Sequence, residues 1–385
     1  MSGAQAVPPL CGTLLRVGRR TLDTTHGAFA AHQFLDLTAR QPVVVLTYGD
    51  TRGDTPLLAR VHSSCLTSES FGGADCDCAG QLDAALERIA RAGRGALFYL
   101  LQEGRGAGLV AKARDRMLVQ ASRDRVTTFD AYARMGLDRD YRRYDAVAFA
   151  CVALGIRAPL ALLSNNPEKV AALGAAGVAL ATVERLERAP SPFNLHYLTS
   201  KSRAGHALSQ PASPAGAARL PEPVTAFEPA PLEGLPRFVR VARYLLPVRA
   251  RPPAEGVYWL RLHVYVDGQN GRERVVFTVA GDGDSEATPL VHVTAETLLA
   301  RFPVRSRVDA WRNAVERLAA RGAGCALFFL HDDPALARHA SPVAALAGDP
   351  DLARLIAHHL PGRAEPLAAD ASLAAALAAA GVIVS

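Results

Sequence analysis

Three cysteines lie close together in the first third of the chain, at a spacing that could bind a metal ion. Cys65, Cys76 and Cys78 are joined by a loop that contains Gly72 and Gly73. Zinc binds thiolates, and three protein ligands leave a fourth position for water, as in catalytic zinc sites. Zinc lowers the pKa of this water, which can then attack an electrophilic carbon near neutral pH. We therefore predict a catalytic zinc site; the alternative is three unrelated buried cysteines.

A glycine-rich loop, QEGRGAGL over residues 102–109, follows an apolar run and could contact a nucleotide. Glycines let the backbone approach a ligand closely, and Arg105 could donate two hydrogen bonds to a phosphate or to a purine edge. The charged segment 138–145 could face a phosphate as well, although a solvated loop explains it equally.

A second candidate for anion binding is SNNPEKV over residues 164–170, which leads from a predicted strand into a predicted helix. The free N–H groups at the start of a helix favour an anion, and Lys169 could add positive charge. A plain helix cap by Asn165 or Asn166 explains the same pattern.

The elements that must position these residues alternate between strands and helices. Apolar, β-branched runs predict strands, and apolar residues at helical spacing predict helices that end at glycines. Strands alternating with helices indicate an α/β fold in which helices cover a sheet. Residues 1–30 are predicted to be irregular. The predicted strands cover residues 43–49, 56–62, 96–101 and 159–164, and the predicted helices cover residues 81–91, 146–154 and 168–176.

The second half of the chain repeats the pattern of the first half. Seven prolines between residues 211 and 236 predict a semi-rigid linker. We therefore predict a catalytic domain over 1–208, a Pro/Ala-rich linker over 209–236 and a second domain over 237–385. Three segments match in the same order, which indicates a duplicated α/β domain. They are 55–66 with 288–298, 84–100 with 313–330, and 170–181 with 373–385.

The second copy has lost the residues that could do chemistry. Thr297 aligns with Cys65, and Leu373 aligns with Lys169. Arg305 stands near the positions of the other two cysteines, together with Arg307. A site with three thiolates is therefore excluded in this copy, although its hydrophobic positions survive and predict that it still folds.

Composition and charge limit the class of protein. The 385 residues are 49% hydrophobic and 21% charged, which excludes a disordered chain. The net charge of +6 suits a nucleotide but is too small to indicate nucleic-acid binding. No apolar run reaches the roughly 18 residues of a membrane span, and residues 1–20 lack a signal-peptide pattern. With only six cysteines, we expect reduced thiols and a cytoplasmic protein without a membrane or nucleic-acid partner.

The motifs of the first half resemble those of the GTP cyclohydrolase II family, zinc enzymes that open the guanine ring of GTP at the start of riboflavin synthesis. The resemblance spans roughly residues 40–206, with the motifs in order and at the family's spacing. The matching segments are RVHSSCLT over 60–67, CDCAGQL over 76–82, QEGRGAGL over 102–109, LLSNNPEK over 162–169, and residues 194–206.

The resemblance implies a layered αβα domain of the GTP cyclohydrolase II type, duplicated here with a degenerate C-terminal copy. Cys65, Cys76 and Cys78 would hold one zinc ion per catalytic domain, whose water attacks C8 of the purine and finally releases formate. Arg142 would attack or stabilise the α-phosphate as pyrophosphate leaves, and Asp140 would accept a proton. Mg²⁺ would accompany the nucleotide. The nucleotide site would consist of Arg60, His62, Ser63, Ser64, Gln81, Glu103, Gly104, Arg105, Thr128, Ser164 and Lys169.

Three departures from the family's motifs bear on the reaction. Ser64 stands where the family has a glutamate, Arg116 stands where it has a tyrosine, and residues 73–75 lack the usual basic residue. A phenol is a plausible aid to the second hydrolysis, so the protein could stop at a formylamino pyrimidine. The alternatives are ring opening of another purine nucleotide in a specialised pathway, and a catalytically inactive nucleotide-binding regulatory protein.

Members of the family form homodimers. A degenerate copy fused to the catalytic domain could take the place of the partner. We therefore expect either a pseudo-dimer within one chain or an ordinary homodimer.

Overall fold

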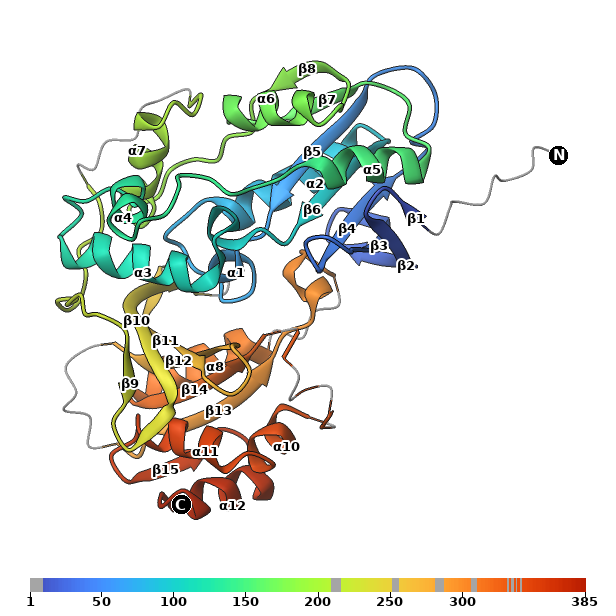
Figure 1. Cartoon of the computed structure of the whole chain (residues 1–385). Helices are drawn as coiled ribbons and strands as arrows, with labels where there is room; N and C mark the ends of the chain where they lie inside the picture. The colour runs from blue at the N-terminus through green and yellow to red at the C-terminus, as the bar shows by residue number, and fades with distance from the viewer. Residues whose placement is uncertain are drawn as a thin grey trace.

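The computed structural model describes residues 10–208, 216–250, 256–280, 287–305, 310–330, 332, 333, 336, 338, 339 and 341–385. The chain forms two α/β units, one above the other in Figure 1, each built on an eight-stranded sheet. In the described residues, no helix is long and apolar enough to cross a membrane.

The first sheet has an antiparallel part followed by a parallel part. Its first five strands in spatial order pair antiparallel, and the last four pair parallel, with one strand shared between the two parts. In spatial order the strands are β1 (Leu10–Cys11), β2 (Leu14–Thr24), β3 (Gly27–Asp36), β4 (Gln41–Tyr48), β6 (Gly95–Leu100), β5 (Leu57–Ser63), β7 (Leu160–Leu163) and β8 (Leu180–Glu184).

The second sheet has the same order and the same strand directions. Both sheets have a register shift in the second strand, between Arg16 and Gly18 and between Arg240 and Ala242. The shared topology confirms the predicted duplication of the fold. The strands are β9 (Ala230–Leu232), β10 (Leu235–Arg249), β11 (Val257–Asp267), β12 (Glu273–Val279), β14 (Gly324–Phe329), β13 (Leu290–Ala295), β15 (Arg363–Pro366) and β16 (Ile383–Val384).

Helices cover both faces of the first sheet. Successive residues of a strand face opposite sides of the sheet, and in the buried strands both sides are apolar. On one face, Val45 and Phe98 pack with residues of α5 and α6. On the other face, Leu46 and Leu97 pack with residues of α2. The layered αβα prediction is thus confirmed. The helices of this half are α1 (Leu66–Glu69), α2 (Cys78–Arg91), the 3-10 helix η1 (Glu103–Gly106), α3 (Gly108–Ala121), α4 (Thr128–Arg134), α5 (Asp145–Leu154), α6 (Pro167–Ala175) and α7 (Leu195–Arg203).

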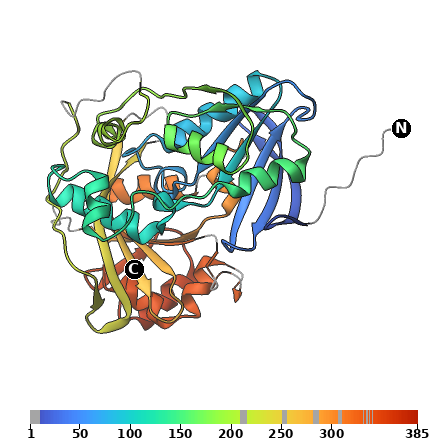
Figure 2. The same cartoon turned by 45° about the horizontal axis from the view of Figure 1, so that its top comes forward.

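The second sheet is also covered on both faces, but one of its covering helices belongs to the first half. Helices of the second half cover one face, while α8 and the apolar side of α3 share the other. Figure 2 shows α3 crossing beside the long strand β10. The helices of the second half are η2 (Leu298–Arg301), α8 (Ala310–Arg321), α10 (Pro342–Ala347), α11 (Pro350–Ala357) and α12 (Ala371–Ala379).

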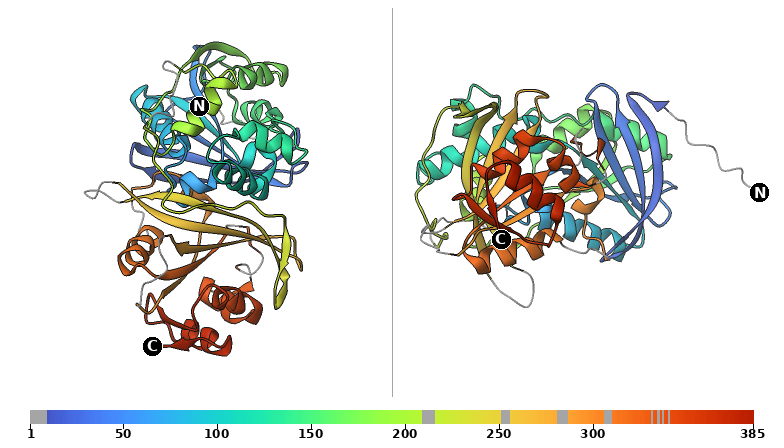
Figure 3. Two further views of the ribbon diagram at one scale, coloured as in Figure 1. Left: turned by 90° about the vertical axis from the view of Figure 1, so that its left-hand side faces the viewer. Right: turned by 90° about the horizontal axis from the view of Figure 1, so that it is seen from below.

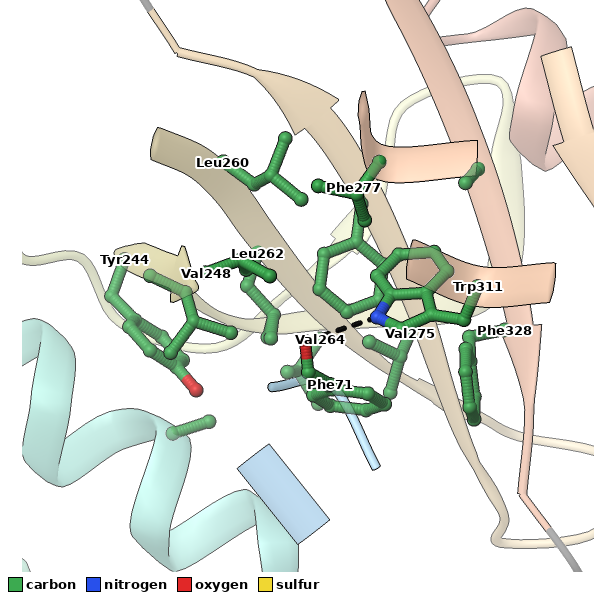
Figure 4. Close-up of a cluster of buried hydrophobic side chains, with 14 of the residues drawn as sticks. Phe71, Tyr244, Val248, Leu260, Leu262, Val264, Val275, Phe277, Trp311 and Phe328 are labelled. Atoms are coloured by element: carbon green, nitrogen blue, oxygen red, sulfur yellow. Dashed lines mark hydrogen bonds between the residues drawn. The ribbon is translucent and has the colours of Figure 1, made fainter. Parts of the chain in front are cut away.

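The two halves exchange one phenylalanine each. Phe71 of the first half lies in the core of the second half, and its backbone carbonyl accepts a hydrogen bond from Trp311 Nε1 at 3.0 Å (Figure 4). Phe302 of the second half lies in the core of the first half, with its ring centroid 4.8 Å from that of Tyr99. The two views of Figure 3 show how closely the halves lie against each other. Each half is therefore completed by a side chain of the other.

The prediction that residues 1–30 are irregular was wrong for those that the structure describes. Residues 10–30 lie mostly in β1, β2 and the start of β3. Only Leu14, Leu22 and Thr24 of β2 are buried, since the strand lies near the edge of the sheet and exposes its arginines. Its apolar alternation is therefore too sparse to stand out. Residues 1–9 lie outside the described residues.

The segment predicted as a linker, 209–236, is described from residue 216 onward. Residues 216–229 contain no helix or strand, and the second sheet begins with β9 inside the predicted range. Val224 and Phe227 of this segment pack against the core between the halves.

Candidate active site around three cysteines

The three cysteines converge at the carboxyl end of β5 and the start of α2. Cys65 immediately precedes α1, and Cys78 is the first residue of α2. The three Sγ atoms lie within 4.8 Å of one another, and those of Cys65 and Cys76 are 3.6 Å apart. Two thiolates bound to one zinc ion at Zn–S distances of about 2.3 Å and tetrahedral angles lie about 3.8 Å apart. The cluster therefore fits zinc, and the described residues contain no other such group.

A lysine and a glutamate lie against the cluster. Lys112 Nζ is 3.1 Å from Cys65 Sγ and 2.6 Å from Glu103 Oε1, while the other oxygen of Glu103 accepts from the amide of Leu66 at 2.6 Å. Burial lowers the pKa of Lys112, but the Cys65 thiol and the Glu103 carboxylate outweigh it and hold that pKa well above its usual value. Burial raises the pKa of Glu103. A permanent positive charge thus stands beside the thiols.

A cavity of about 90 Å³ opens beside the three thiols. It contains most of the predicted site residues, which come from β5 and the loop after it, α2, η1, α4 and the segment before α5. It is lined by Ser63, Ser64, Cys65, Cys76, Cys78, Gln102, Glu103, Gly104, Arg105, Lys112, Asp115, Arg116, Thr128, Tyr132, Arg142 and Tyr197. The predicted residues that do not line it are Arg60, His62, Gln81, Asp140, Ser164 and Lys169.

Arg105 is held in an unusual backbone conformation at the rim of this cavity. Its φ is +55°, a region that side chains other than glycine rarely adopt. Its guanidinium lies 3.8 Å from the centroid of the Phe129 ring and 5.3 Å from that of Tyr132. Nη1 is buried and makes no hydrogen bond within the described residues, and burial lowers the pKa of the group. Arg105 therefore has a spare donor for a ligand.

Asp140 and Arg142 form a close pair in the segment before α5. Arg142 Nε donates to both oxygens of Asp140, at 2.9 and 3.0 Å. Burial raises the pKa of Asp140, but the bonds from Arg142 outweigh it, so that the pKa lies below its usual value. The amide of Tyr141 donates to the carbonyl of Arg105 at 2.9 Å, which ties this segment to η1.

Arg60 and Gln81 belong to a chain of hydrogen bonds behind the cysteines. Arg60 donates to Gln81 Oε1 at 2.6 Å, and Gln81 donates to Asp77 Oδ2 at 2.6 Å. Lys201 Nζ bonds the other oxygen of Asp77 at 2.7 Å. Since Asp77 lies between two of the cysteines, this chain fixes the start of α2. It positions the cysteines and does not reach the cavity itself.

Ser164 and Lys169 lie at the end of β7 and the start of α6. Asn166 caps the helix, accepting from the amides of Glu168 and Lys169 at 3.0 and 3.3 Å. Lys169 Nζ donates to the carbonyl of Val61 at 2.9 Å, and burial holds its pKa well below the usual value. The plain helix cap considered from the sequence is thus present.

His62 points away from the cavity, toward α1. Its Nε2 lies 2.7 Å from Glu69 Oε1, and its ring stacks on that of Tyr99 at 5.7 Å. Burial lowers the pKa of His62. Tyr99 also donates to Glu69, so these side chains form one buried group at the boundary between the halves.

Two of the departures from the family's motifs meet in space. Arg116 Nε lies 3.1 Å from Asp75 Oδ2, and its guanidinium lies 4.9 Å from the centroid of the Tyr197 ring. Ser64 lines the same cavity. The sequence therefore replaces a tyrosine and a basic residue by an ion pair in which both side chains are buried.

Four further residues line the cavity without having been predicted from the sequence as site residues: Lys112, Asp115, Tyr132 and Tyr197. Lys112 lies four residues before Arg116 and three before Asp115 on α3, so the turn of the helix brings it to their side. Tyr197 lies inside the matching segment 194–206, which was the available signal for it.

Comparison with known proteins gives consistent matches. The family described as GTP cyclohydrolase II matches residues 15–187, which include the three cysteines. GTP cyclohydrolase-2 of Shewanella amazonensis is 39% identical over 195 residues, covering 50% of this chain and 93% of that protein. The protein of the same name from Saccharophagus degradans is 40% identical over 199 residues, with 51% and 98% covered. That of Teredinibacter turnerae is 42% identical over 190 residues, with 49% and 92% covered.

Proposed function

The chain belongs to the GTP cyclohydrolase II family, and we propose that it opens the imidazole ring of GTP in a zinc-dependent hydrolysis. It is an enzyme of the GTP cyclohydrolase II type. The observation that carries the proposal is the cluster of three thiols within 4.8 Å, which opens on a cavity shared with Glu103 and Arg105. The relatives from Shewanella amazonensis and Saccharophagus degradans, which this chain covers almost entirely, bear the name GTP cyclohydrolase-2.

Cys65, Cys76 and Cys78 would hold the zinc ion. When bound, zinc lowers the pKa of a coordinated water and so supplies a nucleophile near neutral pH. Three thiolates leave a formal charge of −1 on the bound ion, and the ammonium of Lys112, 3.1 Å from Cys65 Sγ, balances it. Glu103 holds Lys112 in place and accepts the amide of Leu66 at the start of α1.

The nucleotide would bind with its purine near the thiols and its phosphates toward Arg142. Arg105 offers the spare Nη1 donor to an anionic or carbonyl oxygen of the nucleotide. Thr128 donates to Asp115 at 2.6 Å and shares its wall of the cavity. Arg142 would stabilise the α-phosphate as pyrophosphate leaves, and Asp140 orients that guanidinium through two hydrogen bonds and would accept a proton. Mg²⁺ would neutralise the remaining phosphate charge.

The full reaction would give 2,5-diamino-6-(5-phosphoribosylamino)pyrimidin-4-one, formate and pyrophosphate, as in riboflavin biosynthesis. A second candidate is arrest at the formylamino intermediate, after the ring has opened. It is favoured by Arg116, which lines the cavity in place of the family's tyrosine and is paired with Asp75. A guanidinium retains its proton near neutral pH and cannot act as the acid or base that a phenol provides.

We also propose that residues 1–208 form the catalytic unit and that residues 237–385 take the place of a partner subunit. Reciprocal burial of Phe71 and Phe302 supports a pseudo-dimer within one chain. An ordinary homodimer remains the alternative, and the molar mass in solution distinguishes the two.

The experiment that tests the function is a mass spectrum of the products after zinc-loaded protein has been incubated with GTP and Mg²⁺. Pyrophosphate, formate and the diaminopyrimidinone support the full reaction, and a product that retains the formyl mass supports arrest at Arg116. Cys76→Ser is expected to abolish zinc binding and turnover. Cys151→Ser is the matched control, because Cys151 lies on α5 outside the cluster.

Unchanged GTP would contradict the proposal. Conversion of another purine nucleotide would then support the specialised-pathway alternative. Nucleotide binding without turnover of any purine would support a regulatory protein.

A further inference from the structure

The loop that carries the cysteines is paired with a strand of the second half. The amide of Ala74 donates to the carbonyl of Pro247 at 2.7 Å, and the amide of Arg249 donates to the carbonyl of Gly72 at 3.0 Å. These bonds flank an antiparallel bridge between the loop and the end of β10. The part of the loop just before the second cysteine is therefore tied to β10 of the degenerate copy by this isolated bridge.

The side chain of Arg249 adds two more bonds to the same loop. Its Nη1 donates to the carbonyl of Gly73 at 2.8 Å, and its Nη2 donates to the carbonyl of Cys76 at 3.4 Å. Arg312 in turn donates to the carbonyl of Arg249 at 2.8 Å. One guanidinium thus connects a glycine of the loop with the backbone of a cysteine whose thiol belongs to the cluster.

The duplication provides an internal comparison. The bridge between Gly73 and Val248 has a counterpart between Val304 and Thr24, in which the second copy's loop pairs with β2 of the first half. The flanking bonds are repeated too, since the amide of Thr25 donates to the carbonyl of Pro303 at 2.9 Å. Pairing of loop and strand is therefore common to both copies, with or without cysteines.

The two copies differ in the side chain that follows the bridge. Val248 is followed by Arg249, whereas Thr24 is followed by Thr25. The Thr25 hydroxyl donates to the carbonyl of Pro303 at 3.4 Å. Among the residues that the structure describes, a long side chain at this position with two bonds to the loop thus occurs only where the loop bears the three cysteines. This asymmetry indicates that the side chain of Arg249 serves to hold the cysteine-bearing loop, because the two halves pair in both places and only one of them has an arginine.

We propose that Arg249 of the degenerate copy is a positioning residue for zinc binding, which it promotes by holding residues 73–76 in the ligating conformation. The proposal rests on the zinc site of the proposed function. The loop contains Gly72 at φ +77°, so its backbone has much freedom to lose when it is ordered. A loop that is ordered before the metal arrives loses less entropy on binding.

The test is the zinc affinity of the full-length protein, measured by competition with a coloured zinc chelator. The variants are Arg249→Gln, Arg249→Lys and the matched control Arg243→Gln. Arg243 lies on the same strand, is partly buried and donates no hydrogen bond to the loop. Loss of an outer contact to a metal ligand typically weakens binding about 10–100-fold, which is the loss expected for Arg249→Gln. Arg249→Lys keeps the charge with a single donor group and should lose about threefold or more.

All affinities are measured well below the unfolding midpoint of each zinc-free protein, so a general loss of stability does not move them. Wild-type affinity in Arg249→Gln overturns the proposal, as does an equal loss in Arg243→Gln. If Arg249→Gln does not fold, wild-type affinity in Arg249→Lys overturns it. If the wild-type protein takes up no zinc, both this proposal and the zinc site itself are overturned. If every variant binds one equivalent of zinc with the affinity of the wild type, only this proposal is overturned.

Discussion

Replacing Phe302 by alanine tests whether the two halves form one folding unit. Phe302 is fully buried, yet it lies in the core of the first half beside Phe29 and Tyr99. A buried phenylalanine removes roughly 150–250 Å² from water, which at about 25 cal/mol per Å² contributes about 4–6 kcal/mol. Measured losses for Phe→Ala in cores are about 3–5 kcal/mol. We therefore expect Phe302→Ala to lower the free energy of unfolding by about 4 kcal/mol.

The assay is thermal or denaturant unfolding followed by near-ultraviolet circular dichroism. Unfolding entropy is about 2.1 cal/mol/K per residue, so for a single folding unit of 385 residues a loss of about 4 kcal/mol corresponds to a shift of roughly 5 °C. Phe149→Ala is the matched control, since Phe149 is half-buried on α5, within the first half alone. A shift for Phe302→Ala that is no larger than that of the control would refute the reasoning, because the halves would then unfold independently.

Three further predictions concern the site, a buried histidine and the cysteine loop. Arg142→Lys should lower kcat at least about 100-fold with unchanged zinc content, because a lysine ammonium lacks the planar set of donors with which a guanidinium binds Asp140 and a phosphate at the same time. A near-normal kcat would contradict this prediction. Burial lowers the pKa of His32 from 6.5 to about 4, so the unfolded chain binds the proton first and stability is lost as the pH falls from 6.5 toward 4. His32→Gln should remove this component, up to about 3 kcal/mol, from the pH dependence of unfolding. Gly72→Ala should cost more stability than Gly53→Ala, because both have positive φ but only Gly72 has a neighbour, Arg312, within 2.7 Å of an added Cβ; equal midpoints would argue against it.

Local patterns predicted the inner strands of the first sheet closely. The runs at 56–62 and 96–101 correspond to β5 and β6, shifted by one residue. Both strands are largely buried on two faces, so β6 is an unbroken apolar run, and in β5 Leu57, Leu58, Ala59 and Val61 mark the strand although Arg60 and His62 interrupt it. The strand β2 was missed because it lies near the edge of the sheet and carries arginines on its exposed face.

The cysteine spacing and the repeat were visible in the sequence alone. Three cysteines within fourteen residues predicted a cluster of thiols, because residues so close along the chain lie close in space when a loop joins them. The ordered matches between the halves predicted two copies of one fold, and the shared strand order confirmed it. The cysteine cluster depends on residues close together in the sequence, and the duplication depends on a repeated pattern, so both can be predicted from spacing and periodicity.

The contacts between the two halves could be found only in the folded structure. Arg249 bonds the loop from a position 176 residues away, and Phe302 fills a core that belongs to the other copy. Such contacts depend on the relative placement of two complete sheets, and no local pattern in the sequence records it. The ion pair between Arg116 and Asp75 is of the same kind, because two departures 41 positions apart meet only after α3 has packed beside the cysteine loop.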